Sequence, residues 1–105
     1  MSAAGSGLLR ALLRKAGVRR DEIRLVSYRA TEWHSLTFAG ERHEIAFRIP
    51  GSDLMQTTLA LIAGLSDEEM DVPGQIVADI WGAATPAFDD DNAVAVRIEA
   101  LTIEA

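Results

Sequence analysis

Residues 31–49, TEWHSLTFAGERHEIAFRI, decide the fold. The stretch has the composition of two β-strands that meet at Ala39-Gly40, and it contains both histidines of the chain. Because side chains alternate between the two faces of a strand, Leu36 and Phe38 share one face. In the second strand the alternation groups a larger apolar set, Ile45, Phe47 and Ile49. The pattern predicts a β-hairpin whose apolar sets lie on one side of a sheet.

The side that the two apolar sets share determines the expected register of this hairpin. A shift of one residue would turn one set toward water. The expected cross-strand pairs are Phe38 with Glu41, Leu36 with His43, and His34 with Ile45. Ala39-Gly40 suits a two-residue turn poorly, because alanine resists positive φ. We therefore expect a four-residue loop from Phe38 to Glu41.

In that register the two histidines are diagonal neighbours on the core-facing side, with Cβ atoms ~7 Å apart. A glutamate precedes each by two residues, Glu32 before His34 and Glu41 before His43. Imidazoles and carboxylates are metal ligands and proton-transfer groups, so these four residues and Trp33 are candidates for a ligand or metal site. The four groups would form a row ~20 Å long, so at most two histidines and one glutamate would meet at one ion. The alternative is that both histidines are hydrogen-bonded structural residues at the sheet margin.

Size and composition exclude several classes of protein. The chain has 105 residues, 49% of them hydrophobic, which suits one globular domain. It has no cysteine, so disulfide frameworks and cysteine-ligated metal sites are excluded, and a reducing cytoplasm is the expected compartment. No apolar run reaches the ~20 residues that span a bilayer. A net charge of −6 argues against nucleic acid as a partner.

The charge is unevenly distributed, with +5 in residues 1–20 and −11 in the remainder. Residues 1–7 have the composition of a flexible tail, which leaves residues 8–105 as the domain. Residues 8–16 carry a leucine stripe opposite basic residues, which predicts an amphipathic helix ended by Gly17. Residues 8–20 have four possible roles: packing on the domain itself, contacting an anionic membrane surface, entering a partner's groove, or acting as a transit peptide.

The middle of the chain predicts a strand and a second helix. Residues 22–30 are rich in strand-forming residues and either continue into the hairpin or break near Thr31, with a bulge expected near Glu32. Residues 54–65 form a helix with so wide an apolar face that it packs on its own sheet or on another subunit. The candidates for an interaction surface on the two helices are Leu9, Leu12, Leu13, Leu59 and Ile62.

The last third of the chain predicts a second hairpin, formed by residues 75–84 and 93–104. Asp79 shares the parity of Val77 and Trp81, and a carboxylate there must face a cleft, pair with an arginine such as Arg97, or reach an edge. It is a further candidate for ligand binding. The intervening loop contains DDDN at 89–92, whose oxygens suit a divalent cation but lack EF-hand spacing. The apolar parity of residues 93–104 switches near Ala100, so a bulge is expected there.

These elements predict an α+β fold: a four-stranded, mainly antiparallel sheet of two hairpins in ββαββ order. One buried helix covers a face, and the N-terminal amphipathic helix is additional. No glycine loop for phosphate and no nucleophile motif is present, so no cofactor is predicted. The function expected is a non-catalytic protein-interaction or homodimerising module. The alternative is a small-molecule or metal-binding protein, possibly an enzyme, that uses His34 and His43.

Overall fold

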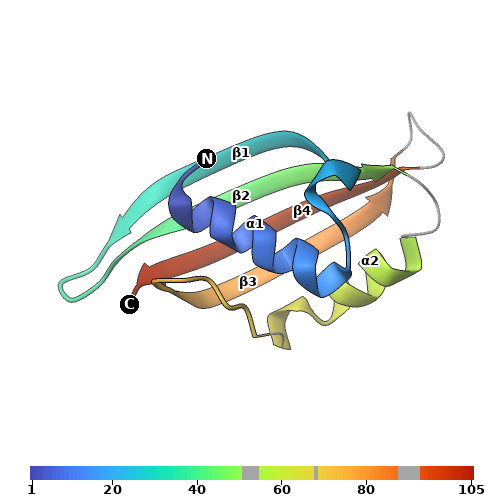
Figure 1. Cartoon of the computed structure of the whole chain (residues 1–105). Helices are drawn as coiled ribbons and strands as arrows, with labels where there is room; N and C mark the ends of the chain where they lie inside the picture. The colour runs from blue at the N-terminus through green and yellow to red at the C-terminus, as the bar shows by residue number, and fades with distance from the viewer. Residues whose placement is uncertain (51–54, 68, 88–92) are drawn as a thin grey trace.

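The computed structural model describes residues 1–50, 55–67, 69–87 and 93–105, without the side chains of residues 55–57, 59 and 67. It confirms the predicted fold class: a four-stranded antiparallel sheet with two helices (Figure 1). The strand order is β1-β2-β4-β3, so the two hairpins meet at β2 and β4. The elements are α1 (Ala3–Ala16), β1 (Arg24–His34), β2 (Ala39–Pro50), α2 (Met55–Ala63), β3 (Gln75–Pro86) and β4 (Ala93–Glu104), with short 3-10 turns η1 (Arg20–Glu22) and η3 (Leu65–Asp67).

Both helices lie on the same face of the sheet. α1 runs across the middle of that face, and α2 lies beside it toward β3 (Figure 1). The core between the layers contains the leucine stripe of α1, the alternate residues of β2 that were predicted to face inward, and the matching set of β4. These buried residues include Leu8, Leu12, Ile45, Phe47, Ile49, Val94, Val96 and Ile98. No described helix or strand covers the opposite face, which we call the outer face.

The N-terminal helix is longer than its composition indicates. Ser2 is the N-cap, and its hydroxyl accepts a hydrogen bond of 3.0 Å from the backbone N–H of Gly5. Gly17 ends the helix with φ 69°, as predicted. The expectation of a flexible tail over residues 1–7 is therefore wrong from residue 3 onward, because an N-cap and a buried first turn order it. Packing of the leucine stripe on the chain's own sheet is the outcome observed among the four alternatives.

The predicted hairpin register is also wrong. His34 pairs with Ala39, Ala30 with His43, and Tyr28 with Ile45, so the turn is at residues 35–38. Within that turn Ser35 N–H donates to the Phe38 carbonyl at 2.8 Å, and Phe38 N–H donates to the Ser35 hydroxyl at 3.0 Å. Leu36 and Phe38 are exposed at the tip instead of facing the core.

Gly40 belongs to β2 and not to a turn. A Cβ at this position would collide with the carbonyl oxygen of Thr102 on β4, so the close approach of the two strands requires glycine.

Two register shifts occur at places that differ from the expected bulges. Residues 24–34 form one continuous strand, and its shift lies between Leu25 and Ser27 instead of near Glu32. β4 pairs with β2 without any shift, and the shift lies opposite, between Val77 and Asp79 of β3. The β3 bulge turns Val77 toward the core while Asp79 and Trp81 face outward, so the expected shared face of these three residues is wrong.

Candidate functional site

The two histidines predicted to form a site are separated by the observed register. His43 pairs with Ala30, which precedes His34 on the same strand by four residues, so the two backbone positions are about 13 Å apart along the strand direction. His43 is fully buried, whereas the side chain of His34 is 68% exposed near the hairpin tip. Within the described residues, the polar contact of the His34 ring is with Glu32, at 3.7 Å between Nε2 and Oε2.

The other predicted ligand-binding residues of this hairpin, Glu32, Glu41 and Trp33, do not form a site with either histidine. Glu32 and Glu41 are cross-strand partners on β1 and β2. Trp33 lies on the outer face, opposite Gly40. No group of three or more potential metal-ligating side chains gathers anywhere in the described part of the chain. The DDDN segment at 89–92 lies outside the described residues.

His43 belongs to a largely buried chain of hydrogen bonds that joins four segments, the N-cap of α1 and the strands β1, β2 and β4. Tyr28 Oη lies 2.9 Å from its Nδ1, and Thr102 Oγ1 lies 2.8 Å from its Nε2. Ser2 Oγ, the N-cap of α1, lies 2.9 Å from Tyr28 Oη. Ser2, Tyr28 and Thr102 are not among the site residues predicted from the sequence. The parity of Tyr28 would have placed it beside His43 only once the correct register was known.

One proton arrangement satisfies every group in this chain of hydrogen bonds. Ser2 donates to Tyr28, Tyr28 donates to Nδ1 of His43, and the Nε2–H donates to Thr102, which donates to the Glu41 carbonyl at 3.5 Å. This arrangement holds the imidazole neutral. Burial lowers the pKa of His43, and the nearby Glu41 carboxylate opposes that shift only in part. These hydrogen bonds link the N-cap of α1 to β1, β2 and β4 through His43.

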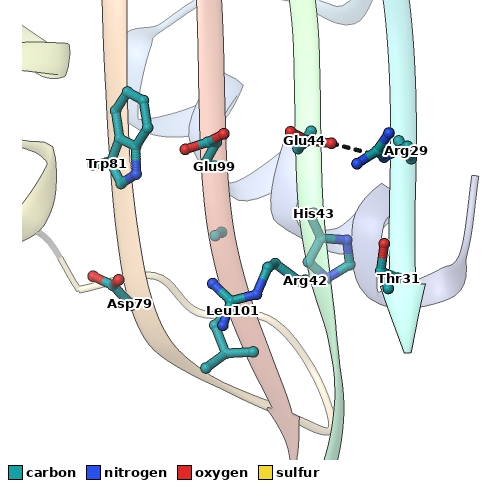
Figure 2. Close-up of a pocket in the computed structure, with 10 residues that line it drawn as sticks. Arg29, Thr31, Arg42, His43, Glu44, Asp79, Trp81, Glu99 and Leu101 are labelled. Atoms are coloured by element: carbon teal, nitrogen blue, oxygen red, sulfur yellow. Dashed lines mark ion pairs between the residues drawn. The ribbon is translucent and has the colours of Figure 1, made fainter. Parts of the chain in front are cut away.

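The outer face carries a shallow hollow of about 250 Å³ over the middle of the sheet (Figure 2). Glu44 forms ion pairs there with Arg29 at 2.9 Å and with Arg97 at 3.6 Å. Arg42 extends from β2 over β4 beside Leu101 (Figure 2). Because these charges are solvent-exposed and mixed in sign, the hollow favours neither a strongly charged nor an apolar ligand.

Asp79 lines this hollow from β3 and is exposed at the sheet edge, two of the outcomes expected for it. The third alternative, an ion pair with an arginine such as Arg97, is not observed among the described residues, where Arg97 lies beside Glu44 and Glu99. Leu101 is the cross-strand partner of Asp79 on β4. No nucleophile with an adjacent base is present in the described lining, in which Thr31 provides the only hydroxyl.

The two edges of the sheet differ in chemistry. β1 and β3 each hydrogen-bond to one strand only within the described sheet. β1 has Arg24, Arg29 and Glu32 among eleven residues, whereas β3 has one charged residue, Asp79, among twelve. Two large apolar residues of β3 are exposed on the outer face, Ile76 at 54% and Trp81 at 46%.

The helical interaction candidates are largely occupied by the chain itself. Leu9, Leu12 and Leu13 are buried under α1, so a partner would have no access to most of their surface in this conformation. Ile62 is half-buried beside β3 and β4. The side chain of Leu59 lies outside the described residues. No helix in the described part has the length and apolar character that a membrane span requires.

Comparison with known proteins identifies no family for this chain. No family model matches the chain, and no curated protein sequence matches it. A solved structure, the type 4 fimbrial biogenesis protein PilO from Pseudomonas aeruginosa, is similar at 15% identity with a TM-score of 0.42. The aligned region covers 94% of this chain and 66% of PilO, so the chain spans just under two thirds of that protein's length. A likeness at this level assigns no function to the chain.

Proposed function

We propose that this chain is a non-catalytic module that associates with a second copy of itself through the edge of β3. The observation that supports this most is the chemistry of that edge: a twelve-residue strand with one charge and two exposed apolar side chains. A long, uncharged edge offers unpaired backbone groups to another strand, and proteins that avoid such pairing place charges there. β1 follows the protective pattern, and β3 does not.

A two-fold axis makes the edge self-complementary. If β3 pairs antiparallel with its copy about Trp81, the two indole rings are neighbours on the outer face. Asp79 of each copy is then opposite Ala83 of the other copy. The β4 neighbour of Ala83 is Arg97, whose side chain can reach over the small alanine toward this carboxylate. The pairing keeps the two Asp79 carboxylates apart and joins the sheets into one of eight strands.

A groove lies beside the first half of β3, next to the proposed contact between copies. It has a volume of about 400 Å³ and is lined by Gln75–Ile80 together with Ser66, Glu69 and Met70. Opposite β3 the described residues that border the groove are Ser66 of η3, Glu69 and Met70, so a strand of a second copy would pass beside them.

The test is the molar mass of the protein in solution, measured by sedimentation equilibrium over a range of concentrations. We expect the mass to rise from 11.4 kDa toward twice that value. The double variant Trp81→Lys, Thr85→Lys should remain monomeric, because the lysine at position 81 would face its own copy across the two-fold axis and the lysine at position 85 adds a second charge to the edge. The lysine that replaces Trp81 would face Glu99 within the chain, so the fold should be retained.

The matched control places the same two charges on the other edge. Ser27 and Thr31 are exposed on the outer face of β1, so Ser27→Lys, Thr31→Lys adds equal charge without touching β3. This control should dimerise like the unmodified chain. A monomeric mass for the unmodified chain at all concentrations, or equal loss of mass in both double variants, would refute association through β3.

A further inference from the structure

An apolar recess with a volume of about 510 Å³ lies between α1 and the start of β1. Its floor is formed by Leu9 and Leu13 from α1, Val18 from the connection, and Leu25 from β1. Ser6 and Arg14 mark its extent along α1, so it is about 12 Å long. This elongated apolar shape is typical of a site for a chain-like ligand.

Three arginines line the same groove: Arg10 and Arg14 from successive turns of α1, and Arg20 from η1. None of the lining residues is acidic. Within the described part of the chain no ion pair engages any of the three guanidinium groups. The acids next in sequence to Arg20 are held elsewhere, since Asp21 and Glu22 lie 3.1 and 3.6 Å from Arg19.

This concentration of positive charge is unusual in a chain whose net charge is −6. Guanidinium groups bind carboxylate and phosphate oxygens in bidentate fashion, and exposed arginines beside apolar surface favour a ligand with both an anionic head and an apolar tail. We propose that the groove binds a single-chain anionic amphiphile, with its head at the arginines and its acyl chain along the exposed Met1 and the half-buried Leu25, above the small exposed parts of Leu9 and Leu13. The proposal is independent of self-association at β3.

A bilayer surface has the same head-group chemistry but fits the geometry less well. A helix that lies on a membrane inserts an exposed apolar face into the interface. In α1 that face is already buried against the sheet, with Leu8 at 0% and Leu12 at 2% exposure. The apolar surface that remains accessible is concave, so one acyl chain can occupy it and a flat lipid layer cannot.

The test uses dodecyl phosphate below its micelle concentration as the probe, with binding measured by titration calorimetry and by methyl NMR shifts. We expect shifts at Leu9, Leu13 and Leu25. Dodecyl maltoside, which has the same tail and a neutral head, and inorganic phosphate, which has no tail, should each bind at least about tenfold more weakly.

The variant Arg10→Gln, Arg14→Gln should weaken dodecyl phosphate binding by about tenfold or more, because charged hydrogen bonds to the head are lost. Both residues are exposed, so the melting temperature should change little. Arg42→Gln on the outer face is the control and should bind as the unmodified chain does. Equal affinity for the maltoside, no effect of the double variant, or binding to anionic vesicles without binding to the monomeric probe would overturn the proposal.

Discussion

At the residue scale, a buried histidine is tolerated because each of its ring nitrogens has a hydroxyl partner. Tyr28 and Thr102 come from different hairpins, and Ser2 joins Tyr28 to the start of α1. Replacing Thr102 with valine should leave a buried ring N–H without a partner and cost about 1–3 kcal/mol in the free energy of unfolding. Urea denaturation measures this. An unchanged midpoint would show that the hydrogen bond contributes nothing.

Thr58 on α2 provides the opposite case. It is also buried, at 2% exposure, but its hydroxyl has no hydrogen-bond partner among the described residues. Thr58→Val should therefore stabilise the fold by about 1 kcal/mol, because an unpaired hydroxyl is removed at nearly constant volume. Urea denaturation of both variants checks this prediction, because the free energy of unfolding should rise in Thr58→Val and fall in Thr102→Val. Equal destabilisation by both substitutions would contradict the difference in their hydrogen bonding.

The lowered pKa of His43 predicts how stability depends on pH. Burial keeps the folded-state pKa below the unfolded value, so the unfolded chain binds a proton first as the pH falls. The contribution to stability is complete above about pH 6.5 and declines below it. Unfolding free energies at about pH 7.5 and about pH 5.5 should differ, and His43→Gln should remove most of the difference.

The exposed His34 provides the control for this pH dependence, because His34→Gln leaves the buried imidazole in place. This variant should retain the decline in stability between the two pH values. The opposite pattern, a decline that persists in His43→Gln and disappears in His34→Gln, would contradict the assignment to His43.

At the element scale, the type and order of the helices and strands could be predicted from the sequence, and the pairing of the first hairpin could not. Residues 93–104 were predicted as a strand with the observed bounds, and Gly17 as the end of α1. The hairpin turn was placed at Ala39-Gly40 by its glycine. Ser35 in fact closes the turn with its hydroxyl and backbone, which exposes Leu36 and Phe38 against the apolar pattern.

Two substitutions distinguish the observed register from the predicted one. Leu36→Ser at the exposed turn should change the free energy of unfolding by less than about 0.5 kcal/mol. Ile45→Ala, in the fully buried centre of β2, should cost about 2–5 kcal/mol. The predicted register would place both residues in the core. A large loss of stability in Leu36→Ser, measured by chemical denaturation, would therefore favour that register.

The candidate sites were less predictable than the elements. A histidine pair was expected from the repeated Glu-x-His pattern, but register decides which residues meet, and a pattern along one strand does not contain that information. Arg10 and Arg14, which line the groove beside α1, were predicted only as part of the basic face of an amphipathic helix. Their relation to Leu25 depends on where α1 crosses the sheet, which sequence periodicity does not specify.

At the scale of the whole molecule, the helices shield one face of the sheet and leave the outer face and both edges open (Figure 1). The two edge strands differ in charge. The charged side chains of β1 oppose the addition of another strand, and the nearly uncharged β3 favours it. Self-association at β3 would leave the α1 groove accessible, since the groove lies at the opposite, β1 side of the sheet. The molecule could therefore bind a ligand and a second copy simultaneously.

The most direct test of self-association through β3, and not through β1, is backbone hydrogen exchange compared at low and high protein concentration. If β3 pairs with its copy, amides of Gln75–Pro86 that face outward should exchange more slowly as concentration rises, while those of Arg24–His34 should not change. Concentration-independent exchange along β3, or protection that develops along β1 instead, would contradict the proposal that this chain associates through its uncharged edge.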